Sequence, residues 1–106
     1  MDNLSNKAKV IYATLDKLEA YNKDSKVTSY AILDYIVEES DDLHEHELLK
    51  EIPEEEFVDI TLDANIKSIN TIITSLAKKG LVNKTEPTSI TVDGTSRNLR
   101  QYFLKK

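Results

Sequence analysis

The first part of the chain has the spacing of an amphipathic helix. Over residues 4–22, apolar side chains recur every three or four positions, with Lys, Asp and Glu between them. This spacing predicts a helix with one face against a core. Ser5 or Asn3 would cap its start, because a short polar side chain can accept a hydrogen bond from the first helical turn.

A second apolar segment follows at residues 29–39. Its hydrophobic side chains cover too wide an arc for one narrow stripe, so we expect a helix that is heavily buried. Thr28 or Ser29 would cap this helix. Just before it, Val27 and Thr28 would form a short strand.

The strongest helical pattern lies in residues 62–79. Its apolar stripe consists of Leu62, Ile66, Ile69, Ile73 and Leu76. Lys78 and Lys79 fall in the last turn, where the helix dipole favours cations, and Gly80 suits a left-handed cap. We therefore expect a helix that ends at Lys79.

The opposite face of this third helix is polar and lacks acids. Lys67, Thr71, Thr74 and Lys78 lie opposite the apolar stripe, flanked by Ser68, Asn70 and Ser75. No acidic residue occurs between Asp63 and Glu86, in a chain that has 19 acids. An ordinary solvated face would usually mix Glu with Lys. The pattern suits a surface that approaches phosphates and base edges, and the alternative is plain polar surface with a chance gap in acids.

Short extended segments follow the third helix. After Leu81 and Val82 comes Pro87, which interrupts strand pairing, and then the β-prone residues 90–92. Asp93 and Gly94 predict a turn, and residues 99–104 are extended. We expect a β-hairpin, which makes the fold mainly α with a small β-hairpin, an α+β class.

Residues 40–61 separate the second helix from the third. Asp42 and Glu45 have the spacing of a helix start, and Pro53 would end that helix, so we expect a short helix over residues 42–51. Residues 54–60 would then lead into the helix at 62–79.

The order of helix, Lys-Lys-Gly-Leu-Val and hairpin resembles the C-terminal half of a winged helix-turn-helix domain, as in MarR-like and related bacterial and phage DNA-binding regulators. The residues that carry the resemblance are 69–84, INTIITSLAKKGLVNK, and 97–104, RNLRQYFL. The resemblance implies a single winged-helix domain over residues 1–106, with the segment at 62–79 as recognition helix. The family joins its two central helices by a turn of about three or four residues, so residues 40–61 would be an acidic helical insertion.

The resemblance also implies double-stranded DNA binding, in transcriptional regulation. The recognition helix would enter the major groove, and the hairpin would hold the backbone or minor groove. The DNA-binding candidates are Lys67, Ser68, Asn70, Thr71, Thr74, Lys78, Lys84, Arg97 and Arg100. A monomer with so few cations would bind weakly, and a homodimer through the first helix would bind more tightly.

The net charge of −5 is unevenly distributed. Residues 1–37 are neutral overall, residues 38–63 hold twelve acids and one Lys, a net −11, and residues 64–106 have a net +6. The basic part coincides with the candidate DNA-binding elements. The acidic segment is a solvated face, a docking surface for a basic protein partner, or a phosphate mimic. An alternative function is therefore a protein-interaction winged helix that docks a partner through residues 38–59 without binding DNA.

Composition and motifs argue against other classes. The chain has no cysteine and two glycines, and no glycine-rich phosphate loop or nucleophile triad is evident. On a helix His44 and His46 would point about 200° apart, so we expect no metal site. Because the phosphate loop and the nucleophile triad are also missing, we expect no cofactor and no enzyme. No apolar run approaches membrane-spanning length and no signal peptide is evident, so we expect a cytoplasmic protein without a membrane partner.

Overall fold

The computed structural model describes residues 4–105, so Asn3 lies outside the described residues. Its elements are α1 (Asn6–Lys17), the 3-10 helix η1 (Lys23–Ser25), α2 (Ser29–Glu38), α3 (Ser40–His44), α4 (Glu54–Asp63), α5 (Ile66–Lys78), β1 (Val82–Lys84), β2 (Thr88–Val92), β3 (Thr95–Leu99) and β4 (Tyr102–Leu104). The expected α+β class, mainly helical with a small hairpin, is confirmed.

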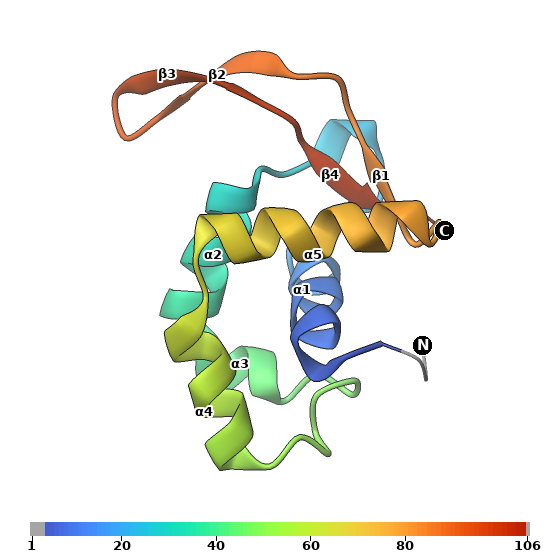
Figure 1. The fold of residues 1–106 in the computed structure, drawn as a ribbon, viewed down its shortest axis with the longest axis vertical. Helices are drawn as coiled ribbons and strands as arrows, with labels where there is room; N and C mark the ends of the chain where they lie inside the picture. Colours follow the sequence, from blue (N-terminus) through green and yellow to red (C-terminus); the bar gives the residue numbers. More distant parts are fainter. Residues whose placement is uncertain (1–3, 106) are drawn as a thin grey trace.

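The helices pack around α1, which lies behind α5 at the centre of the molecule (Figure 1). Helix α5 contacts α1, α2 and β1, while α3 packs against α1 and α2. The β2–β3 hairpin projects at one end of the molecule, and α3 and α4 lie at the opposite end (Figure 1). The largest fully buried side chains are Leu15, Ile32, Ile36, Leu43, Leu49, Ile69, Ile73, Leu76 and Leu104.

The strands form two small antiparallel pairs. β1 pairs with β4, with Val82 opposite Leu104, and β2 pairs with β3 to form the hairpin. The expected strand at Val27 exists as a single bridge to Tyr102, whose two backbone hydrogen bonds are 2.9 and 2.7 Å long. Strand β4 is therefore hydrogen-bonded on both sides, and it ties the N-terminal half of the chain to the end of α5.

Several local signals in the sequence are confirmed. Ser5 caps α1 by accepting from the Ala8 N–H, and Thr28 caps α2 by accepting from the Ala31 N–H. Gly80 ends α5 at φ 80°, a left-handed conformation that glycine adopts without steric cost. The hairpin turns at Asp93 and Gly94, as expected, with φ of 51° and 79°.

The expected first helix is too long. Helix α1 ends at Lys17 rather than at residue 22, because Glu19 takes a left-handed conformation with φ 56°. The Ala20 N–H then donates to the Leu15 carbonyl over 3.0 Å, which completes a Schellman cap. A non-glycine residue at this position gives no strong signal in the sequence.

The predicted helix over residues 42–51 is wrong. Helix α3 ends at His44, and residues 45–52 form turns. The His46 side chain partly explains why residues 45–52 form turns and not a helix. Its Nδ1 accepts from the Leu48 N–H over 3.1 Å, so that N–H has a partner outside a helix. The buried Leu49 anchors the turns in the core.

The expected start of the third helix is also wrong. Residues 54–63 form a separate helix, α4, with three glutamates in its first turn, where the helix dipole favours negative charge. Helix α5 starts at Ile66 after the cap residue Asn65, and Leu62 belongs to α4 with 77% of its surface exposed. The segment between α2 and α5 is acidic and helical as expected, but it contains two helices, α3 and α4.

Helix α2 matches its expected bounds within one residue, but it is only partly buried. Ile32 and Ile36 are in the core, whereas Val37 is 63% exposed. The expectation of heavy burial therefore holds for one face of the helix alone.

Candidate nucleic-acid interface

Helix α5 presents its polar face to solvent because its apolar stripe is fully used in the core. Ile69, Ile73 and Leu76 are each at most 1% exposed. Asn65 accepts from the Ser68 N–H over 2.9 Å at the start of the helix. Both ends of α5 are thus fixed, and its opposite face has a defined orientation.

Five of the nine candidate residues lie on this outer face. Lys67, Asn70, Thr71 and Lys78 are exposed and Thr74 is half-buried. Asn70, Thr71, Thr74 and Lys78, together with Ser75, line one shallow depression. The Thr71 hydroxyl donates to the Lys67 carbonyl over 3.0 Å, so its oxygen is left to accept from a ligand.

Asn70 is oriented by a residue from α2. The Ser29 hydroxyl donates to Asn70 Oδ1. With its oxygen engaged, the Asn70 side chain can offer its NH₂ group to an acceptor such as a phosphate or a base edge. Burial raises the pKa of the neighbouring Tyr102, with smaller opposing effects from Ser29 and Arg100, so this phenol stays neutral at physiological pH.

Ser68 lies on a different side of α5. It lines a depression with Lys7, Ile60 and Asp63, which come from α1 and α4. The structure therefore separates Ser68 from the outer face and places it near a carboxylate.

The basic residues of the strands have different surroundings. Lys84, at the end of β1, is exposed. The Arg97 guanidinium of β3 lies 5.5 Å from the centre of the Tyr30 ring, a cation–π distance that links the hairpin to the start of α2. Arg100 Nη1 donates to the Thr85 carbonyl over 3.0 Å, so this cation also holds the base of the hairpin together.

A second depression lies between the hairpin and the helices. Residues of α2, α5 and the hairpin base line it, namely Ser29, Tyr30, Ile66, Asn70, Pro87, Asn98, Leu99, Arg100 and Tyr102. Asn70 lines both this depression and the one on the outer face of α5. The outer face of α5 is therefore continuous with the base of the hairpin.

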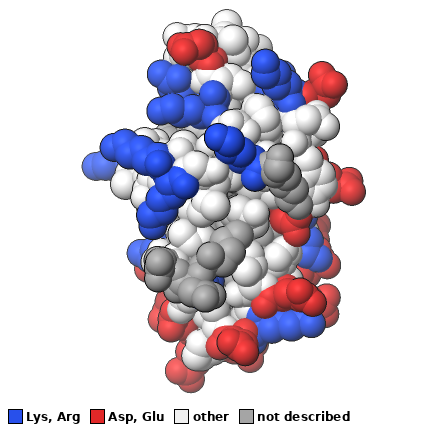
Figure 2. All heavy atoms as spheres, turned by 90° about the vertical axis from the view of Figure 1, so that its right-hand side faces the viewer, with Lys and Arg blue, Asp and Glu red and all other residues white. Residues whose placement is uncertain are grey.

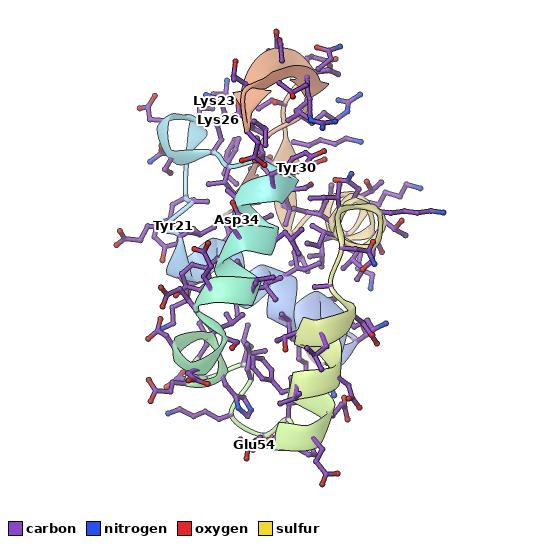
Figure 3. All side chains as sticks on the ribbon, turned by 90° about the vertical axis from the view of Figure 1, so that its left-hand side faces the viewer. Tyr21, Lys23, Lys26, Tyr30, Asp34 and Glu54 are labelled. Atoms are coloured by element: carbon purple, nitrogen blue, oxygen red, sulfur yellow. The ribbon has the colours of Figure 1, made fainter. Side chains whose placement is uncertain are left out.

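Sequence reasoning missed three residues at this end of the molecule. Figure 3 shows Lys23, Lys26 and Tyr30 at the end that carries the hairpin, with Glu54 at the opposite end. Lys26 Nζ donates to the Lys23 carbonyl over 2.9 Å, which holds that lysine on η1. The two lysines of the polar stretch before Val27 were visible in the sequence, but nothing local indicated that they lie near the hairpin.

Positive and negative charges gather at different ends of the molecule. Figure 2 shows one face on which most Lys and Arg lie in the upper half and most Asp and Glu in the lower half. The acidic α3 and α4 lie at the end away from the hairpin (Figure 1). Acids also occur beside the basic elements, namely Asp63 near Ser68, Glu86 between β1 and β2, and Asp93 in the hairpin turn.

The cations of α5 and the strands have no internal counter-charge among residues 4–105. In that part of the chain Lys17 and Asp42 form an ion pair at 3.3 Å, and His46 Nε2 is hydrogen-bonded to Asp16 at 2.7 Å. Both lie outside α5 and the hairpins. The exposed lysines Lys67, Lys78 and Lys84 therefore have no carboxylate partner within these residues that a phosphate would have to displace.

The two histidines have structural partners. His44 stacks on Phe57 with ring centres 4.1 Å apart, and its Nε2 lies 3.0 Å from the Ile52 carbonyl. His46 Nδ1 accepts from Leu48, so its Nε2 carries the proton that is donated to Asp16. Within residues 4–105 no three His, Asp or Glu side chains are grouped to hold a metal ion.

No helix in the described part of the chain combines the length and apolar character needed to cross a membrane. Comparisons with protein-family models, with curated proteins and with solved structures gave no match. They therefore lend no support to the resemblance to winged-helix regulators, and the assignment of function depends on the surface described above.

Proposed function

We propose that this chain is a winged-helix protein that binds double-stranded DNA, in transcriptional regulation. Helix α5 is its recognition helix and the β2–β3 hairpin is its wing. The observation that carries the proposal is the acid-free outer face of α5, which exposes Lys67, Asn70, Thr71 and Lys78 and continues into the hairpin base.

The order of elements supports a winged helix. Apart from α3 and α4, which lie between α2 and α5, the order is helix α1, a short strand at Val27, helix α2, helix α5, strand β1 and an antiparallel hairpin. The strand at Val27 pairs with β4 after the hairpin. Helix α2 packs against α5, as the first helix of a helix-turn-helix pair packs against its recognition helix. The insertion of α3 and α4 lengthens the connection between α2 and α5, but α2 and α5 still contact each other.

The position of the insertion also supports DNA binding. If α3 and α4 covered the outer face of α5, their carboxylates would repel phosphates. They lie instead at the end of the molecule away from the hairpin (Figure 1), where the Asn6 side chain donates to Glu56 and links α1 to α4. The positive surface is left open to a duplex.

Each candidate residue then has a role of its own. Asn70, whose Oδ1 is engaged by Ser29, would read a base-edge acceptor through its NH₂ group, and Thr71 would contact bases or phosphates. Lys67, Lys78 and Lys84 would bind phosphates, and Arg97 would do so at the wing. Arg100 would contribute mainly by holding the wing base to Thr85. Thr74 is half-buried and would contribute less, and Ser68, which lies on another side of α5, would contribute least.

The test is duplex binding at low salt by the wild type and by a variant that carries Lys67→Glu and Thr71→Glu. Both residues are exposed, so the fold should survive. We expect the wild type to bind mixed-sequence duplex and the variant to lose at least tenfold in affinity, because reversed charge on α5 repels phosphates. A wild type that binds no duplex at low salt would remove the basis of the proposal.

Partner binding without DNA is the second candidate, and the exposed acids of residues 38–59 favour it. The same measurement separates the two functions. Failure of the wild type to bind duplex would leave partner binding as the function of this fold.

A further inference from the structure

Exposed hydrophobic side chains lie on α2 and α4, away from the candidate DNA-binding surface. Val37 on α2 is 63% exposed, and Val58 and Leu62 on α4 are 44% and 77% exposed. Val58 and Leu62 are four residues apart and so share one stripe of α4. The two helices pack against each other, and both face the viewer in Figure 3. Single exposed hydrophobic residues are normal, but a stripe on packed helices is typical of an interaction site.

The stripe of Val58 and Leu62 is not part of the hydrophobic core. Phe57 of α4 is 3% exposed and packs inward, with Ile60 and Ala64 half-buried beside the core. Val58 and Leu62 point to a different side of the helix from these three residues. The stripe is therefore additional apolar surface that folding leaves in water.

A depression next to the stripe combines apolar and acidic groups. Its lining residues all come from α3 and α4, and they are Ser40, Asp41, His44, Glu54, Phe57, Val58 and Thr61. Neither Asp41 nor Glu54 takes part in an ion pair within residues 4–105. The depression thus offers two carboxylates beside Val58, an arrangement that suits a Lys or Arg side chain, whose stem is apolar and whose head is charged.

Further carboxylates are exposed on the same two helices. Asp34 and Glu38 on α2, and Glu55 and Asp59 on α4, are exposed. Figure 3 shows Asp34 on the helix that faces the viewer. The surface therefore has an apolar centre and an acidic rim.

The negative charge of the rim determines which kind of partner can bind. In a two-fold symmetric dimer a second copy would bring an equally acidic surface against this one, and nucleic acids and anionic membranes would also be repelled. A basic partner would be attracted. The ten residues of α4 span about 15 Å, which matches a partner helix of about three turns.

We propose that the surface formed by Val58, Leu62, Asp41 and Glu54 binds a basic amphipathic helix of another protein. The apolar face of that helix covers Val58 and Leu62, and its Lys or Arg side chains meet Asp41 and Glu54. This mode is a helix lying in a groove, read by apolar anchors at spacings of three and four residues. The inference does not depend on the proposed DNA binding, and it would give the protein a second, separate binding surface.

The test uses labelled model peptides of about 14 residues, roughly four helical turns. One peptide combines Lys and Leu in an amphipathic pattern, a second keeps the Lys but replaces Leu by Gln, and a third keeps the Leu but replaces Lys by Glu. We expect the wild type to bind the first peptide at least tenfold more tightly than either of the others in fluorescence anisotropy. Equal binding of the first two peptides, or no binding of the first, would overturn the proposal.

Two matched variants locate the site. Asp41→Asn with Glu54→Gln should weaken binding of the Lys-Leu peptide at least tenfold, whereas Glu47→Gln with Glu51→Gln changes the net charge equally and should have less than a twofold effect. Equal losses in the two variants would indicate attraction by charge alone and would overturn the proposal.

A third variant tests the apolar centre and separates this proposal from DNA binding. Val58→Ser with Leu62→Ser should weaken peptide binding at least tenfold without changing duplex affinity or the thermal melting of the fold, because both side chains are exposed. A wild-type dimer in sedimentation that these substitutions dissociate would overturn the proposal in favour of self-association.

Discussion

At the scale of single residues, one oxygen of Asp42 connects three helices. The Tyr35 hydroxyl donates to Asp42 Oδ2 over 2.7 Å, and Lys17 Nζ lies 3.3 Å from the same oxygen. These partners lower the pKa of Asp42, the Tyr35 hydrogen bond more than Lys17. Burial and the bond to Asp42 in turn raise the pKa of Tyr35 to about 12. Helices α1, α2 and α3 are thus held together by a charged carboxylate.

This arrangement predicts a pH dependence of stability. Because the pKa of Asp42 is lower in the folded state than in the unfolded chain, its contribution is present above the unfolded pKa of about 3.9 and is lost as the pH falls through the folded pKa. Asp42→Asn should therefore lower the free energy of unfolding at neutral pH, and the difference from wild type should vanish in acid. Urea unfolding of both proteins from about pH 7 to about pH 2 measures this difference. A difference that is the same at all pH values would contradict the role assigned to the charge.

At the scale of elements, the start of α5 positions the whole candidate surface. Asn65 caps this helix through the Ser68 N–H. Asn65→Ala should lower the free energy of unfolding by about 0.5–2 kcal/mol, because the capping bond is lost. Urea unfolding measures this loss, and Asn98→Ala, at an exposed position of β3, serves as control. Equal effects of the two substitutions would argue against the cap.

Elements with local signals could be predicted from the sequence. Ser5, Thr28, Gly80 and the Asp93-Gly94 turn each act on backbone groups within a few residues, so their side chains or conformations mark an end or a turn directly. These signals fixed the end of α5 and the turn of the hairpin.

The region between α2 and α5 could not be predicted in the same way. Pro53 can end a helix or precede one, and it precedes α4 here. Leu62 continues the spacing of the α5 stripe by coincidence, while the true boundary is set by Asn65. Whether Pro53 ends a helix or precedes one depends on the packing of Phe57 and Leu49 into the core.

The candidate site was likewise predictable only in its local part. The outer face of α5 follows from helical spacing. The contacts of Ser29 with Asn70, and of Tyr30 with Arg97, join residues distant in sequence. No local pattern encodes them, because they depend on how the hairpin and α2 meet.

At the scale of the whole molecule, the separation of charge is the main feature. A protein with net charge −5 can bind DNA only if its acids are held away from the duplex. Residues 38–63, which include α3 and α4, hold twelve of the 19 acids, and these two helices lie at the end opposite the hairpin (Figures 1 and 2). The same separation leaves the acidic end available to a basic partner, so the two surfaces could be occupied together.

The salt dependence of duplex binding tests this account most directly. Lys67→Gln with Lys78→Gln removes two cations from α5, and Lys7→Gln with Lys50→Gln removes two exposed cations elsewhere, with the same change in net charge. The logarithm of the association constant should fall linearly with the logarithm of salt concentration in the wild type. The α5 variant should reduce that slope by about one to two units, and the control variant should leave it unchanged. Equal slopes for the two variants, or a wild type whose binding does not depend on salt, would contradict the account.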